Sequence, residues 1–179
     1  MKQRFAIGLV LMWIMGTGCE KEYYYGPEDQ PVYFEYHYIN QAWGVADNGW
    51  LIDNEGKVWG YDRPEDYRWP DSTGHLTFED LEYNLAQADT LLLSFKCNEL
   101  EKYTRLIRGA ADGHLSESRT RGADMGSACL SCYAYDQETG TYTYVLLSAT
   151  GDWEQFNQSA EAEILVDWMK DFEGLMFFD

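Results

Sequence analysis

Short runs of aromatic and β-branched residues predict strands at several places along the chain. The run from Val32 to Tyr38 is rich in aromatic strand formers. Two further runs, at residues 49–53 and 57–61, flank the turn Asn54-Glu55-Gly56, which is the pattern of a hairpin. A second hairpin is predicted for residues 129–147, with its turn at residues 136–140.

Apolar residues that recur every three or four positions predict three helices. The first helix is expected from Phe78 to Ala88, with Thr77 as its N-cap and Asp80 in its first turn. The second is expected over residues 98–111 and ends before a glycine. The third is expected over residues 160–172, with these side chains facing inward: Ile164, Leu165, Trp168 and Phe172.

The order of these elements predicts the fold class. Strands are grouped in hairpins and do not alternate singly with helices, which favours an α+β fold over a parallel α/β fold. We therefore expect a mainly antiparallel sheet, built from hairpins and packed with about three helices, in a single domain over residues 32–179. Residues 62–75 and 112–126 are rich in turn-forming and polar residues and are expected to be loops.

The first residues carry the three parts of a secretory signal. Lys2 and Arg4 form a short cationic start, and an unbroken apolar run follows from Phe5 to Met15. Small residues then lead to Cys19. A membrane-spanning helix needs about 20 apolar residues, so this run is too short to remain as a transmembrane anchor. The segment 1–18 is therefore expected to be a signal peptide.

The run Gly16-Thr17-Gly18-Cys19 resembles the lipobox of bacterial lipoproteins, although a larger aliphatic residue is usual at the place of Gly16. The resemblance implies that Cys19 is lipidated and that residues 19–31 form a tether. Two or more acyl chains hold a protein stably on a membrane. Acidic residues directly after the cysteine resemble those of small outer-membrane lipoproteins of the Bacteroidota, which implies an outer-membrane location, facing the periplasm or the cell surface. The alternative is an ordinary exported protein that begins at Cys19.

Composition limits the partners of this chain. Its formal net charge of −18 at pH 7 opposes contact with phosphate backbones and with anionic lipids. No nucleic-acid partner is therefore expected, and contact with the membrane is expected through the lipid anchor only. Aromatic residues make up 16% of the chain, which indicates a folded domain and not a disordered one.

Lipidation of Cys19 would leave three further cysteines, Cys97, Cys129 and Cys132. In an oxidising envelope, Cys97 could pair with Cys129 or with Cys132. The C-x-x-C spacing of the last two is also that of redox dithiols, but such pairs sit at a helix N-terminus. Here they fall in a predicted strand, where positions three apart face opposite sides, so a buried thiol or one structural disulfide is the better interpretation.

Few residues suggest catalysis. Asp152 and Glu154 beside Trp153 offer two carboxylates, the pair that glycoside hydrolases use. No motif for a nucleophile, a zinc protease or a phosphate loop is present in the sequence. We therefore assign no catalytic residue, no metal site and no cofactor, and we expect a protein that is not an enzyme.

The tryptophans suggest a second kind of binding, to glycans. A flat indole can stack on the face of a sugar ring, and the candidates for such stacking are Trp50, Trp59, Trp69 and Trp153. The alternative is that most of these rings fill the core of the domain.

The sequence thus leaves four functions open. The leading hypothesis is a non-enzymatic envelope lipoprotein that binds a protein or assembles with neighbours at the outer membrane. The alternatives are a surface glycan-binding lipoprotein, an inhibitor or immunity-type protein with an acidic binding face, and a hydrolase that uses Asp152 and Glu154.

Overall fold

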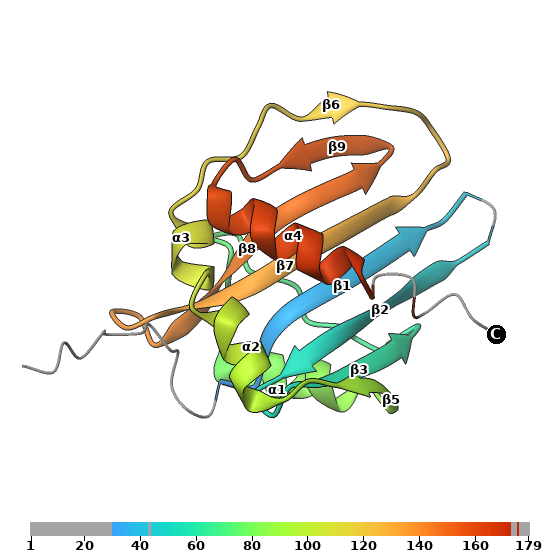
Figure 1. Cartoon of the computed structure of the whole chain (residues 1–179). Coiled ribbons are helices and arrows are strands. Elements are labelled where there is room, and N and C mark those ends of the chain that lie inside the picture. Colours follow the sequence, from blue (N-terminus) through green and yellow to red (C-terminus); the bar gives the residue numbers. More distant parts are fainter. Residues whose placement is uncertain (1–29, 43, 173–174, 176–179) are drawn as a thin grey trace, which may run out of the picture.

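The computed structural model describes residues 30–42, 44–172 and 175, which form an α+β domain around one mainly antiparallel sheet (Figure 1). The strand order in the sheet is β5-β3-β2-β1-β7-β8-β9-β6, and β4 pairs with β8. The strands are β1 (Val32–Asn40), β2 (Ala46–Asp53), β3 (Lys57–Asp62), β4 (His75–Leu76), β5 (Thr90–Ser94), β6 (Arg119–Thr120), β7 (Ser127–Asp136), β8 (Thr141–Gly151) and β9 (Trp153–Phe156). The helices are α1 (Phe78–Ala86), α2 (Cys97–Thr104), α3 (Ile107–Ala111) and α4 (Ala160–Lys170).

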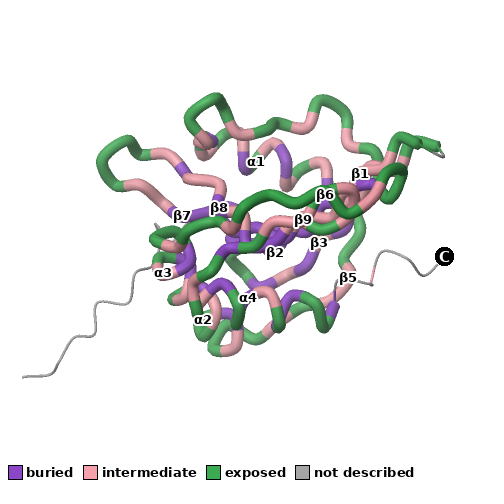
Figure 2. The backbone as a smooth tube through the Cα atoms, turned by 90° about the horizontal axis from the view of Figure 1, so that it is seen from above, coloured by how far each residue is buried: buried purple, intermediate pink, exposed green. Residues whose placement is uncertain are grey.

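Both faces of the sheet are covered, as Figure 2 shows from above. Helices α2, α3 and α4 lie on one face, and α1 lies on the other. Alternate residues of a strand point to opposite faces, so the sheet has two apolar layers. Phe34, Trp50 and Leu165 are fully buried in the layer on the α4 side. Leu51, Tyr61 and Tyr133 belong to the layer on the α1 side.

The helical layer differs from the sequence prediction in two places. Ile164, which we expected to face inward, is 51% exposed, whereas Leu165 beside it is fully buried. The helix expected over residues 98–111 is interrupted after Thr104 and resumes at Ile107 as α3. Leu100 before the break and Ile107 and Ala110 after it are all buried in the core, and α3 packs against α4.

Helix α1 begins as the sequence predicts. The Thr77 side chain accepts a hydrogen bond from the Asp80 backbone N–H, and the Asp80 carboxylate accepts one from the Thr77 backbone N–H. This reciprocal pair satisfies donors that a helix N-terminus leaves without an intrahelical partner. The cap therefore fixes the start of α1 directly after β4, and residues 63–74, the 63–74 loop, connect β3 to β4.

The chain enters the sheet at Gln30. This side chain is buried, and its Nε2 donates to the carbonyl oxygens of Val32 and Tyr133 at 2.8 and 2.9 Å. The entry point therefore lies at the first residues of β1, the strand between β2 and β7. Among the described residues, none of the helices is long and apolar enough to cross a membrane.

Candidate functional site

A buried carboxylate stands at the centre of the sheet face that α1 covers. Glu35 on β1 is 2% exposed and accepts hydrogen bonds from three tyrosine hydroxyls. Tyr67 donates to Oε1 at 2.6 Å, Tyr61 donates to the same oxygen at 3.3 Å, and Tyr133 donates to Oε2. A charged group buried in a protein is tolerated when its hydrogen-bonding capacity is filled in this way.

The backbone around this carboxylate makes room for the phenols. Gly49 on β2 pairs with Tyr61 on β3, and a Cβ atom at Gly49 would lie 2.5 Å from the Tyr61 hydroxyl oxygen. Glycine at this position therefore lets the Tyr61 ring lie over β2 and reach Glu35. Burial, and next the charge of Glu35, raise the pKa of the Tyr61, Tyr67 and Tyr133 hydroxyl groups well above 10.0.

His37 lies two residues further along β1, on the same face as Glu35. Its Nε2 is 2.8 Å from Asp47 Oδ1, and the ring is 7% exposed. The indole of Trp69 stacks on this imidazole, with ring centroids 4.7 Å apart and planes at 26°. Trp69 itself is 53% exposed. One side of its ring is therefore held by His37, and the rest faces solvent.

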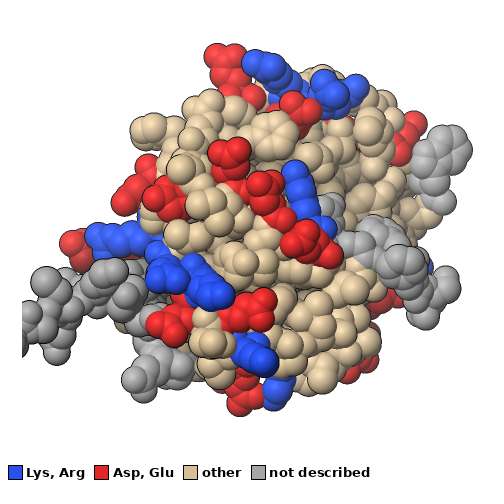
Figure 3. All heavy atoms as spheres, in the orientation of Figure 1, with Lys and Arg blue, Asp and Glu red and all other residues tan. Residues whose placement is uncertain are grey.

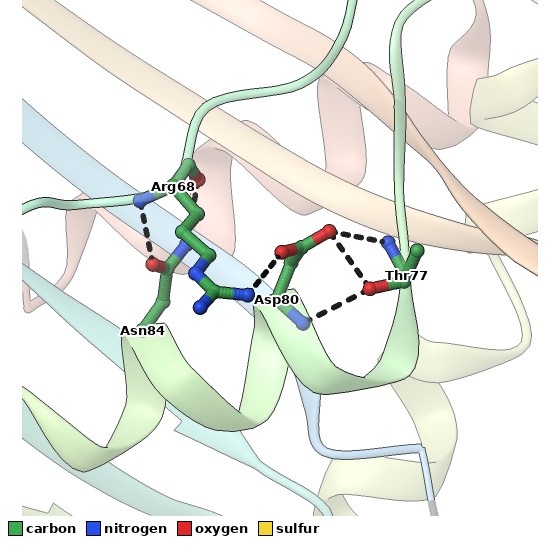
Figure 4. Close-up of polar contacts among 4 residues, drawn as sticks. All are labelled: Arg68, Thr77, Asp80 and Asn84. Atoms are coloured by element: carbon green, nitrogen blue, oxygen red, sulfur yellow. Dashed lines mark hydrogen bonds and ion pairs between the residues drawn. The ribbon is translucent and has the colours of Figure 1, made fainter.

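The 63–74 loop brings Trp69 to this place through two contacts on neighbouring residues. Tyr67 points to Glu35 on the sheet, as described above. Arg68 points to α1, where its backbone N–H and C=O bond to the Asn84 side chain at 2.8 Å each (Figure 4). The Arg68 guanidinium also forms an ion pair with Asp80, with Nη1 2.7 Å from Oδ1. The position of Trp69 is thus set by the residues directly before it.

A pocket of about 410 Å³ opens at the end of the sheet where β1 ends and β7 begins. Its lining residues include Trp153, which is 57% exposed. Gln41, Asp124 and Asp152 line the same pocket. Amide and carboxylate groups beside an open aromatic ring are suited to binding a ligand that is apolar on one side and rich in hydroxyl groups on the other.

The polar groups of this pocket are held to different degrees. Asp152 Oδ1 accepts the Met125 backbone N–H at 2.8 Å, and its Oδ2 makes no hydrogen bond to a described residue. The Gln41 and Asp124 side chains are exposed and make no hydrogen bond to the part of the chain that the structure describes. The pocket therefore offers both hydrogen-bond donors and acceptors to a ligand.

The four tryptophans proposed for glycan stacking occupy different environments. Trp50 is fully buried, where it stacks on Tyr36 and contacts Phe172, so it fills the core. Trp59 is half-buried, and its Nε1 donates to Asp53 Oδ2 at 2.8 Å. Only Trp69 and Trp153, among these four, present about half of their surface to solvent.

The cysteines of the domain also differ in exposure. Cys97 is exposed, Cys129 is half-buried and Cys132 is buried, and none of the three is joined in a disulfide. Cys132 lies in the apolar layer on the α4 side, whereas Cys129 pairs with His37 and lies on the other face. Burial raises the pKa of both Cys129 and Cys132 above 9.0, which favours the thiol over the reactive thiolate.

The two carboxylates considered for hydrolysis, Asp152 and Glu154, have different partners. Asp152 lines the pocket and is bonded to Met125, whereas Glu154 pairs with Arg121 at 3.1 Å. Within the described residues, no group of three or more His, Cys, Asp or Glu side chains is arranged to hold a metal ion.

Sequence reasoning did not identify Glu35, His37 or Asp47 as a cluster. The sequence does contain one signal for it. Glu35 and His37 alternate with aromatic residues in the run from Val32 to Tyr38, and two polar residues on one face of such a strand indicate a buried polar site. Comparison of the chain with protein-family models, with curated proteins and with solved structures finds no match in any of the three.

Proposed function

We propose that this protein is a lipid-anchored binding protein of the bacterial cell envelope, attached through Cys19, and that it binds a glycan without catalysing a reaction. The observation that carries the glycan assignment is that Trp153, which is about half exposed, lines one pocket together with Gln41, Asp124 and Asp152. An aromatic ring packs on the apolar face of a sugar, and amides and carboxylates bond its hydroxyl groups.

The partners of Asp152 and Glu154 favour binding over hydrolysis. Glycoside hydrolases use two carboxyl groups that flank the scissile bond. Here Glu154 is engaged by Arg121, and Asp152 is engaged by a backbone N–H, so each carboxylate has a structural partner. On the face that Figure 3 shows, acidic and basic side chains are interspersed, so this face is not the uniformly acidic surface that the inhibitor hypothesis expects.

A glycan array tests the binding proposal. The probe is the purified domain without its lipid, and we expect binding to a limited set of neutral or amino sugars. Trp153→Ala should abolish the signal, because it removes the stacking surface. Phe156→Ala is the matched control, because Phe156 is 38% exposed on the same strand but lies an odd number of residues away and so faces the other side. An array without hits overturns the glycan proposal.

The anchor is tested separately. Intact mass of the protein extracted from membranes should show acyl chains on Cys19 and no residues before it. Cys19→Ala should release the protein into the soluble fraction. A Cys19→Ala protein that stays in the membrane overturns the anchor, whatever the array shows. Protease treatment of whole cells then tells surface display from a periplasmic orientation.

A protein partner is the second candidate, and one observation favours it. Phe156 at the end of β9 is 38% exposed, and Leu115, which is 45% exposed, forms a bridge with the next residue, Asn157. Exposed apolar residues that lie close together on a surface are typical of protein contact surfaces. Phe156→Asp should then reduce capture of the partner in a membrane pull-down, whereas Trp153→Ala should not. Equal capture by both variants and the unchanged protein removes this candidate.

A further inference from the structure

The sheet face beside the Trp153 pocket carries a continuous row of residues across four strands. His37 on β1 pairs with Cys129 on β7, Cys129 pairs with Ala149 on β8, and Ala149 pairs with Gln155 on β9. Residues that pair directly in an antiparallel sheet point to the same face. This is the α1-side face, because His37 lies with Glu35 on it.

The floor of this face is made of small residues. Cys129 and Ala149 form the middle of the row, and Ser127 and Gly151 form the middle of the next row toward the pocket. All four are half-buried, so the floor is open to solvent in part. Side chains of this size leave a shallow, flat surface, and Ser127 also lines the pocket, which joins the two features.

A half-exposed indole lies at each end of this floor. Trp69 stacks on His37 at the β1 end. At the other end, Trp153 lies two residues before Gln155 on β9 and so faces the same side. Three strand spacings separate β1 from β9, which corresponds to about 14 Å. The indoles are therefore too far apart to contact a single sugar ring together.

We infer that this face binds a linear oligosaccharide of several rings that spans from Trp153 to Trp69, and that its rings are neutral or cationic. The inference rests on the proposed glycan-binding function and extends it to the ligand class. A chain of sugars presents flat apolar faces at intervals, which fits two indoles at the ends of a flat floor. The carboxylates of Asp124 and Asp152, together with the net charge of −18, oppose uronic acids and sulfated sugars.

The 63–74 loop has a defined part in this inference. Tyr67 and Arg68 fix the loop to Glu35 and to α1, so Trp69 is in position before a ligand arrives. A contact that is formed in advance adds affinity because little conformational entropy is lost on binding. Trp69 is therefore a specificity-determining residue for chain length, and Trp153 is the residue that any bound glycan needs.

Chain length is the variable that tests the inference. The sugars that bind on the array are supplied as a series from the single sugar to the hexasaccharide, and their dissociation constants are measured by calorimetry with the folded domain. We expect affinity to rise about ten- to a hundredfold along the series and then level off, because a second stacking contact is gained once the chain reaches Trp69. Trp69→Ala should remove this gain, so that short and long chains bind with similar affinity.

A second variant blocks the floor without touching either indole. Ala149→Phe places a large side chain between the two ends and should abolish the gain with length. Thr150→Phe is its matched control, because Thr150 is exposed on the same strand and points to the opposite face. Circular dichroism and thermal melting of each variant confirm that it is folded.

The outcomes separate the inference from the function on which it rests. If glycans bind and Trp153→Ala abolishes binding, but affinity is independent of length or unaffected by Trp69→Ala, the oligosaccharide inference is wrong and the glycan-binding function stands. Binding of acidic sugars in preference to neutral ones also overturns the inference. If no sugar of any length binds, both the inference and the proposed function are wrong.

Discussion

Removal of the Tyr67 hydroxyl group tests whether its hydrogen bond to Glu35 holds the 63–74 loop on the sheet. Tyr67→Phe deletes the oxygen that donates to Glu35 Oε1 at 2.6 Å and leaves the ring in place. Tyr61 and Tyr133 continue to donate to the carboxylate, so Glu35 is not left without partners. The variant therefore removes the contribution of the Tyr67 hydroxyl group and keeps the other two donors to Glu35.

The expected effect follows from the kind of bond. A hydrogen bond to a charged group contributes about 1.5–3 kcal/mol to stability, and Glu35 is only 2% exposed, so little water can replace it. For a domain of this size, each kcal/mol corresponds to roughly 2–4 °C in melting temperature. Urea denaturation followed by circular dichroism should show the loss in free energy of unfolding, with an unchanged m-value because the same surface is exposed.

Tyr83→Phe is the matched control for this measurement. Tyr83 lies on α1, where its ring faces the Arg68 guanidinium at 4.3 Å, and its hydroxyl makes no hydrogen bond to any described residue. Its replacement should change stability by less than about 0.5 kcal/mol. A loss of that small size in Tyr67→Phe as well would refute the view that the phenol of Tyr67 fastens the loop.

Three further predictions concern pH, backbone and thiols. Burial raises the pKa of the tyrosines around Glu35, so the stability that their protonated hydroxyl groups contribute is complete below pH about 10 and is lost as the pH rises above it. Urea midpoints measured at increasing alkaline pH, together with tyrosinate absorbance, check this. Gly151→Ala should destabilise the domain by about 2–4 kcal/mol, because the φ angle of Gly151 is 122° and an added Cβ would lie 2.1 Å from the Gly126 carbonyl oxygen. Gly140→Ala is the control: an added Cβ there would have open space, so the same urea titration should show a loss of about 1 kcal/mol. In a maleimide time course read by mass, Cys97 should react first and Cys132 only after unfolding, and equal rates would contradict the assigned burial.

Local signals in the sequence account for much of the secondary structure. The α1 cap could be predicted because Thr77 and Asp80 are close in sequence and their bonds form within one turn. Strands on both sides of residues 54–56 follow from turn chemistry, which is also local. The α+β class with a mainly antiparallel sheet follows from the order of these elements.

What the sequence could not reveal depends on contacts between distant residues. Glu35 accepts hydrogen bonds from Tyr67 and from Tyr133, which are 32 and 98 positions away. No periodicity in one segment encodes such a meeting. The exposure of Ile164 has a similar origin, since which side of α4 is buried depends on where the sheet lies. The sequence named Trp69 and Trp153 as candidates but could not tell them from the buried Trp50, because exposure is a property of the assembled fold.

The position of Gln30 has a mechanical consequence under the proposed anchoring. A tether from the membrane would enter at the first residues of β1, whereas the pocket opens beyond the last residues of the same strand, roughly 27 Å away. Tension between a bound glycan and the membrane would then act along β1. Hydrogen bonds to β2 and β7 run across that direction on both sides, so the load would be shared in shear by many bonds and would not open them one at a time. Such an arrangement suits a protein that holds a ligand against a pull.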